Sequence, residues 1–200
     1  MPVGTLMPIF GFDLTKPIIS QIDIFLNWLQ KTNQSYWQLL PINAQSINNL
    51  SPYSNLGIGL INFIDPIEIT DLEVEQFSQN NSWAFTLALH SYLTAQYNTD
   101  HWWLWPQLIS NRDPETLSQL ATSKYSQIYK HLQIQATNFK IWQIIKLKAN
   151  DKKIKIIGDL PFYIDKSSPL VWQFREAFEI EPKGFTPQVS GVPVSKAFPR

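Results

Sequence analysis

The 200-residue sequence contains no cysteine. This absence excludes disulfide frameworks, thiolate nucleophiles and thiolate zinc sites together. It suits the reducing environment of the cytoplasm, where we expect the protein to be located. The apolar segment 1–10 agrees with this expectation, because it has neither the basic start nor the small-residue cleavage site of a signal peptide.

The sequence also lacks an excess of charge of either sign. Its 16 Lys and Arg residues balance 16 Asp and Glu residues, so the formal net charge is zero. Without a basic stripe to neutralise a phosphate backbone, we expect no nucleic-acid partner. No run of about 18 apolar residues occurs, so we expect no membrane span.

Aromatic residues, in contrast, are plentiful. They make up 14% of the chain and include 8 tryptophans. Large aromatic side chains serve mainly in core packing. A flat aromatic ring also suits the apolar face of a sugar, so the composition leaves core packing and sugar stacking both open.

Hydrophobic patterning predicts an α/β fold. Residues 3–10 form a short apolar segment typical of a strand, residues 17–31 have helical spacing, and residues 35–40 are a second strand candidate. Residues 43–59 are rich in Asn, Ser, Pro and Gly and predict a loop. This order predicts a βαβ unit with a long loop after its second strand.

The pattern continues with helices before a third strand. Helical spacing and capping residues predict helices over 71–77, 82–96, 113–123 and 125–149, with Ser82 as an N-cap and Pro114 at a first helical position. The β-branched segment 155–160 predicts the third strand. We therefore interpret residues 1–200 as a single domain and residues 66–150 as a helical insertion within it.

Two side chains are candidates for a functional site on position alone. Asp159 directly follows the third predicted strand, and the carboxyl ends of strands line the active sites of α/β barrels. The structural alternative is an aspartate that caps a turn. Tyr53 lies in the long loop, where its ring can either stack on a sugar or pack beneath the loop.

The histidines are weaker candidates. Asp100 and His101 are adjacent and of the right types for acid–base work, but they lie in the predicted insertion, so we interpret them as structural. His90 and His131 lie within helical patterns that offer no second ligand at metal spacing, and we expect no metal site.

Three sequence segments carry a resemblance to a known family. Residues 36–41 are YWQLLP, followed by SPY at 51–53, and residues 103–106 are WLWP, followed by RDPE at 112–115. Residues 156–164 are IIGDLPFYI, with VW at 171–172 and GVP at 191–193. Together they resemble the 4-alpha-glucanotransferases of the amylomaltase type, whose motifs include YWQVLPL, SPYQ and IIGDLPIYV. The resemblance spans most of residues 20–193.

The resemblance implies the N-terminal part of a (β/α)8 barrel, its first three strands, with a helical insertion between strands 2 and 3. It implies an α-1,4-glucan or maltooligosaccharide as partner, no cofactor, and transfer of glucan segments with retention of configuration. By match, Asp159 touches the substrate at the end of the third strand and Tyr53 is a glucan-contacting aromatic. Ser51, from the same SPY motif, completes the expected substrate-binding set.

The family's catalytic carboxylates have no counterpart in this sequence. Retention requires a carboxylate nucleophile and a carboxylic acid, which the family carries in RxDHFRG and EDLG motifs after its fourth and fifth strands. Neither motif, nor the family's later THDN, occurs before Arg200. We therefore expect no catalytic residue here and interpret the chain as a truncated, inactive fragment. The alternatives are a non-catalytic glucan-binding module, or one half of a split enzyme whose barrel a second chain completes.

Overall fold

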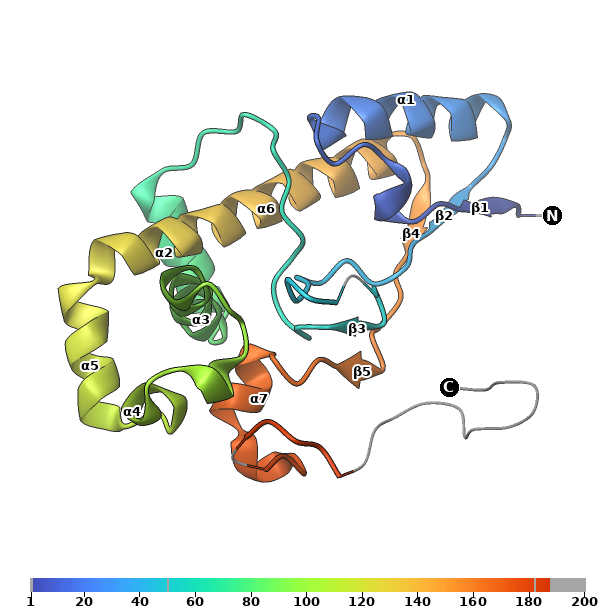
Figure 1. Cartoon of the computed structure of the whole chain (residues 1–200). Helices are drawn as coiled ribbons and strands as arrows, with labels where there is room; N and C mark the ends of the chain where they lie inside the picture. Colours follow the sequence, from blue (N-terminus) through green and yellow to red (C-terminus); the bar gives the residue numbers. More distant parts are fainter. Residues whose placement is uncertain (1, 50, 182, 188–200) are drawn as a thin grey trace, which may run out of the picture.

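Three parallel strands form the main sheet of the computed structural model (Figure 1). They are β1 (Gly4–Leu6), β2 (Tyr36–Gln38) and β4 (Lys155–Ile157), in the spatial order β1-β2-β4. The structure describes residues 2–49, 51–181 and 183–187, so GVP at 191–193 and Arg200 lie outside the described residues. Parallel strands alternating with helices confirm the predicted α/β class.

The strands are shorter than the sequence predicts. The strand expected over 3–10 ends at Leu6, because Pro8 has no N–H for a ladder and the next residues form the 3-10 helix η1 (Ile9–Gly11). The strand expected over 155–160 ends at Ile157. Leu39 N donates to Ile157 O at 2.9 Å. Beyond this bond, Pro41 interrupts the segment after β2 and Pro161 interrupts the segment after β4.

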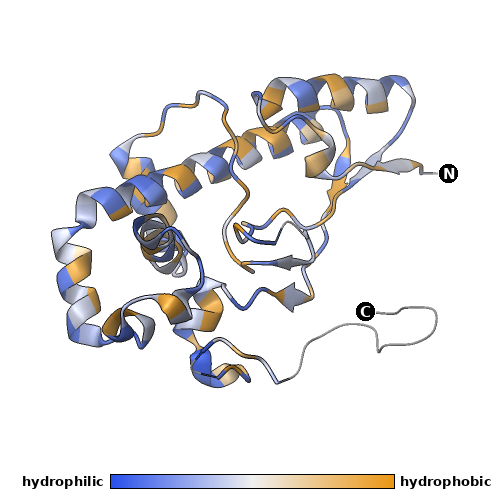
Figure 2. Cartoon of the chain, in the orientation of Figure 1, coloured by the Kyte–Doolittle hydropathy of each residue, from blue (hydrophilic) through white to orange (hydrophobic). Residues whose placement is uncertain are grey.

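Two helices, α1 (Ile18–Lys31) and α6 (Tyr125–Asp151), pack against one face of the sheet (Figure 1). Both carry hydrophobic residues interleaved with polar ones (Figure 2). The core between helices and sheet includes Trp37, Leu39, Leu26, Leu29, Ile141 and Ile145. The first turn of α1 is capped from a distance, since the backbone N–H groups of Ile18 and Ile19 donate to the Asp65 carboxylate at 2.8 and 2.9 Å.

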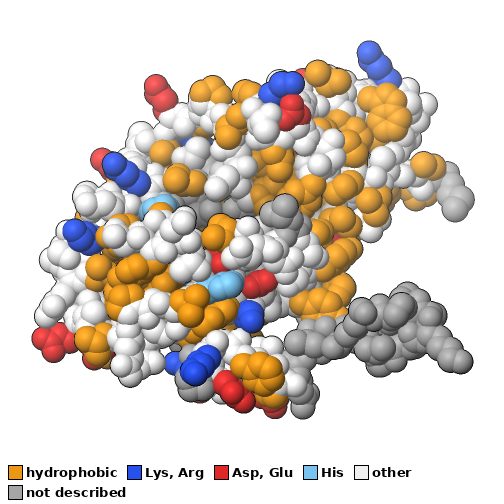
Figure 3. Space-filling model, in the orientation of Figure 1, with side chains coloured by type: hydrophobic (Ala, Val, Ile, Leu, Met, Phe, Trp, Pro, Cys, Tyr) orange, Lys and Arg blue, Asp and Glu red, His pale blue; other side chains and the backbone are white. Residues whose placement is uncertain are grey.

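The opposite face of the sheet carries exposed apolar side chains. Leu6 and Ile157 stand in one register row, and their exposed fractions are 53% and 44%. Gln38, between them in the same row, is also exposed. Hydrophobic side chains gather on the side of the molecule where β4 and β5 (Tyr163–Ile164) lie (Figure 3). Parallel sheets are normally buried on both faces. This sheet departs from that rule, because it is covered on one side only.

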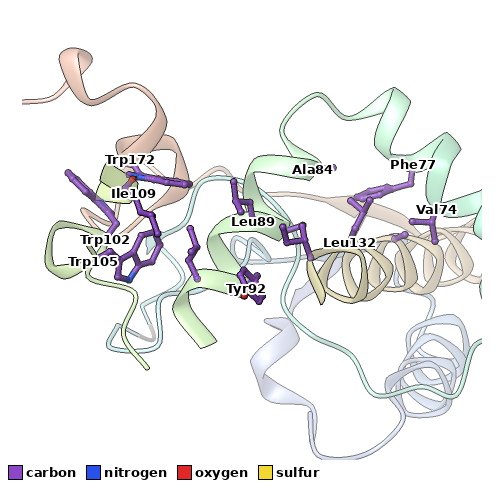
Figure 4. Packing of buried hydrophobic residues seen from close by; sticks show 14 of the residues in the cluster. Val74, Phe77, Ala84, Leu89, Tyr92, Trp102, Trp105, Ile109, Leu132 and Trp172 are labelled. Atoms are coloured by element: carbon purple, nitrogen blue, oxygen red, sulfur yellow. The ribbon is translucent and has the colours of Figure 1, made fainter. Parts of the chain in front are cut away.

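The segment between β2 and β4 is largely helical. Its elements are β3 (Ser54–Asn55), α2 (Asp71–Asn80), α3 (Ala84–Tyr97), η2 (Trp102–Leu104), α4 (Gln107–Ser110), α5 (Pro114–Ser123) and α6. A second hydrophobic core joins these helices to α7 (Pro169–Gln173), with Trp102, Trp105 and Trp172 buried in it (Figure 4). For these three tryptophans the core-packing interpretation is therefore correct.

Of the two predicted helix starts that rest on capping residues, that of α5 is confirmed and that of α3 is wrong. Helix α5 begins at Pro114 as predicted, with the Asp113 carboxylate accepting from Thr116 N at 2.9 Å. The prediction of Ser82 as an N-cap is wrong. Helix α3 starts at Ala84 with Trp83 as its N-cap and no side-chain capping bond. Ala84 N instead donates to Asn81 O at 2.8 Å, so a backbone turn replaces the side-chain cap.

Strands β3 and β5 form a second, two-stranded parallel sheet (Figure 1). The chain beyond α7 continues through the short 3-10 helix η3 (Arg175–Ala177). Within the described ranges, no helix has the length and apolar character needed to cross a membrane.

Candidate functional site

The small sheet of β3 and β5 joins two segments that are far apart in the sequence. Tyr163 N donates to Tyr53 O at 3.1 Å, and Asp165 N donates to Asn55 O at 2.8 Å. These backbone bonds hold the loop after β2 against the segment after β4. The site therefore lies beyond the carboxyl ends of two neighbouring strands of the main sheet, where open α/β sheets bind their ligands.

Tyr53 and Asp159, the two residues predicted by position, meet in this arrangement. Tyr53 Oη donates to Asp159 Oδ2 at 3.1 Å across a sequence separation of 106 residues. This hydrogen bond, with burial and the nearby negative charge, raises the pKa of Tyr53, so the phenol stays protonated. Both side chains are half-buried. A half-buried carboxylate fixed by one donor can still accept a hydroxyl from a ligand.

The ring of Tyr53 is also part of an aromatic pair. It stacks on Phe162 with the ring centroids 4.9 Å apart and the planes inclined by 30°. Phe162 in turn contacts the ring of Tyr163 edge-on at 4.7 Å. Phe162 is not among the site residues predicted from the sequence, although it lies three residues after Asp159 in the same motif.

Ser51, the third predicted site residue, is placed differently. It is exposed, its N–H donates to Asn49 Oδ1 at 3.1 Å, and its carbonyl accepts from Ser54 N at 3.2 Å. Among the described residues, no hydrogen bond joins its side chain to Tyr53 or Asp159. Its observed contacts are those of a turn residue leading into Tyr53.

Two aspartates outside the predicted site residues anchor the loop. Asp100 is 3% exposed, and its carboxylate accepts from Ser46 Oγ at 2.6 Å, Ile47 N at 3.1 Å and Asn48 Nδ2 at 2.9 Å. The carboxylate of Asp165 accepts from Asn49 Nδ2 at 3.0 Å. Asp100 thus holds residues 46–48 of the Tyr53 loop, and Asp165, directly after β5, holds the adjacent Asn49.

The contacts of Asp100 help to decide whether the Asp100–His101 pair is structural or suited to acid–base work. His101 Nε2 lies 4.0 Å from Asp100 Oδ1, and the His101 ring stacks on Trp103 with centroids 4.6 Å apart. A buried carboxylate with three loop donors is an anchor, and this agrees with the structural interpretation of the pair.

The remaining histidines border a cavity of about 270 Å³ beneath the loop. Its lining includes His90 and Thr94 of α3, His131 of α6, and Ser46 of the loop. Burial is the main cause that lowers the pKa of His90, to about 4, so its imidazole is neutral at pH 7. Within the part of the chain that the structure describes, no group of three or more His, Cys, Asp or Glu side chains could hold a metal ion.

The fold and this geometry define an α/β protein with a carboxylate and aromatic side chains at the carboxyl ends of parallel strands. Comparison with known proteins assigns this chain to a family. The sequence profile of 4-alpha-glucanotransferases matches residues 67–196, so the chain belongs to the 4-alpha-glucanotransferase family. This confirms the resemblance inferred from the motifs.

Individual relatives agree with this assignment. The chain is 25% identical to the 4-alpha-glucanotransferase of Aquifex aeolicus over 84% of this chain and 44% of the relative. It is 30% identical to the chloroplastic/amyloplastic 4-alpha-glucanotransferase of Solanum tuberosum over 84% of this chain and 39% of the relative. The chain therefore spans less than half the length of these curated relatives.

A solved structure shares the fold. The amylomaltase from Streptococcus agalactiae, solved in complex with acarbose, superposes with a TM-score of 0.81 at 20% identity. The match covers 99% of this chain and 51% of the amylomaltase.

Proposed function

We propose that this chain provides the glucan-binding part of an enzyme that transfers α-1,4-glucan segments between maltooligosaccharides. The observation that carries the proposal is the hydrogen-bonded pair of Tyr53 and Asp159 at the strand ends of a chain in this family. A carboxylate accepts sugar hydroxyls, and an aromatic ring covers an apolar sugar face. Ser51 belongs to the proposed site as the residue that opens the turn into Tyr53.

We assign β1, β2 and β4 to the first three strands of a (β/α)8 barrel, with residues 66–150 as its helical insertion and residues 1–200 as one partial barrel domain. Retaining transfer needs a nucleophilic carboxylate and an acid, for which the expected RxDHFRG and EDLG motifs are absent from these 200 residues. In this proposal Asp159 binds rather than attacks, and the 200 residues alone have no turnover. A cytoplasmic location stays a prediction.

Replacing the Asp159 carboxylate tests this proposal. Asp159→Asn is expected to weaken the binding of maltoheptaose by about tenfold, because a charge-assisted hydrogen bond to a sugar hydroxyl becomes a neutral one. The melting temperature should stay nearly unchanged, since the side chain is only half-buried. Titration calorimetry measures the affinity, and a thermal melt followed by circular dichroism measures the stability.

Asp151→Asn is the matched control, because Asp151 is exposed at the end of α6 and precedes the opposite end of β4. The control should bind maltoheptaose like the unchanged chain. Equal affinities for both variants, or a large drop in the melting temperature of Asp159→Asn, would contradict a binding role for Asp159. Release of glucose from maltotriose by the purified chain would contradict the proposed lack of turnover.

The half-covered sheet supports a second candidate role, that of one half of a split enzyme. A polypeptide with the half of the family fold that this chain does not span would pair with the free edge of β4 and cover Leu6 and Ile157. Co-expression with that half of a relative should give a complex that co-purifies. Ile157→Glu should abolish the complex, whereas Leu147→Glu, at a 61% exposed position on α6, should not. If the halves never co-purify, this role is wrong.

A further inference from the structure

We propose that Phe162 is a specificity-determining residue of the glucan site, where the open face of its ring, backed by the stacked ring of Tyr53, forms an aromatic shelf for a glucosyl unit. This inference rests on the proposed function and adds to it a residue that neither the motif match nor the comparisons assign. The family motif quoted above has isoleucine at this position, whereas this chain has Phe162. The quoted motif by itself therefore does not supply the ring of the shelf.

The placement of the ring supports this role. Phe162 is 67% exposed, although it lies in the connection between two strands and next to the half-buried Tyr53. The stacking on Tyr53 and the edge contact with Tyr163 hold the ring on one side and along its rim. A large apolar ring that is fixed in place and still open to solvent is typical of a binding surface rather than of a core.

A backbone hydrogen bond also helps to hold the shelf in place. The bond from Tyr163 N to Tyr53 O, at 3.1 Å, ties the residue after Phe162 to the backbone of Tyr53. The Tyr53 hydroxyl is held in turn by Asp159. The two rings and the carboxylate are thus prearranged relative to one another, which reduces the entropy lost when a ligand binds.

The chemistry of the shelf matches one class of ligand. A glucosyl unit has an apolar face of C–H groups and a rim of hydroxyls. The aromatic shelf offers a flat apolar surface, and the Asp159 carboxylate beside it offers an acceptor for a hydroxyl. A branched aliphatic side chain such as isoleucine has no flat face, so it covers a sugar ring less completely.

The test uses substitutions of Phe162 in the full 200-residue chain with maltoheptaose as the probe. Phe162→Ile and Phe162→Ala are expected to weaken binding by about five- to tenfold, and Phe162→Tyr to keep it within about twofold, because tyrosine retains the flat ring. Phe174→Ala is the control, since Phe174 is 45% exposed at the C-cap of α7 and, among the described residues, its ring pairs with neither Tyr53 nor Phe162. It should leave the affinity unchanged.

The outcomes separate this inference from the proposal on which it rests. If Asp159→Asn weakens binding while Phe162→Ile and Phe162→Ala bind normally, the glucan site stands and the aromatic shelf is wrong. If the unchanged chain gives no binding heat with maltoheptaose, both the glucan site and the shelf are wrong. If Phe162→Tyr loses affinity as strongly as Phe162→Ala, ring stacking is not the cause of the loss, and the shelf is again wrong.

Discussion

Trp37→Ala is expected to lower the free energy of unfolding by about 3–5 kcal/mol, one of the largest effects of any single substitution in this chain. Trp37 lies on the central strand β2 and is fully buried between the sheet and helices α1 and α6. Its ring contacts those of Phe12, Phe25 and Trp142 at centroid distances of 6.2, 5.5 and 6.5 Å. Truncation would leave a cavity that these large rings cannot easily fill.

The substitution also removes a hydrogen bond, because Trp37 Nε1 donates to Met7 O at 2.7 Å. Urea unfolding followed by far-ultraviolet circular dichroism measures the change. Trp28→Ala is the control, since Trp28 is 47% exposed on α1 and its loss should cost about 1 kcal/mol or less. Similar losses for the two variants would show that the sheet–helix core does not dominate the stability of this chain.

Acidification is expected to destabilise the protein through His90. Burial lowers the pKa of the folded-state imidazole to about 4, from an ordinary value of about 6.5. The nearby Asp100 opposes this shift, and Arg112 adds to it. Below about pH 6.5 the unfolded chain binds a proton that the folded chain does not. The stability contribution is therefore fully present above that pH and is lost as the pH falls towards 4.

The difference between the two pKa values corresponds to about 3 kcal/mol in total, and about 2 kcal/mol of this should be lost between pH 7 and pH 5. Two carboxylates whose pKa is lowered to about 2, those of exposed Asp13 and half-buried Glu73, act mainly below this range. Urea unfolding at pH 7, 6 and 5 measures the slope. His90→Phe should flatten it, and an unchanged slope in that variant would exclude His90 as the cause.

Much of the fold was predictable because it follows from local patterns. Helical spacing predicted α1 and α6, and a proline after an aspartate predicted the start of α5. The β-branched segment predicted β4, although not its end, since the length of a strand depends on the hydrogen bonds of its neighbour. The N-cap prediction at Ser82 failed because a backbone turn competed with the side chain for the same role.

The candidate site was predictable only in part. Position and motif selected Tyr53 and Asp159, and the structure brings them together. Neither could select Phe162, because exposed stacking on Tyr53 depends on two segments that meet only in the folded chain. Asp100 was likewise invisible as a loop anchor, since its partners Ser46 and Asn48 lie more than 50 residues away in the sequence.

The sequence by itself determined the longer helices and the strands of the main sheet, the family, and two residues that meet in the candidate site. Each of these depends on local sequence, because propensity, periodicity and motifs involve only a few neighbouring residues. The tertiary structure alone decided which distant segments meet, through β3 and β5, each only two residues long and without detectable periodicity. It also decided that one face of the main sheet carries exposed apolar side chains, because burial is a property of packing and not of any single segment.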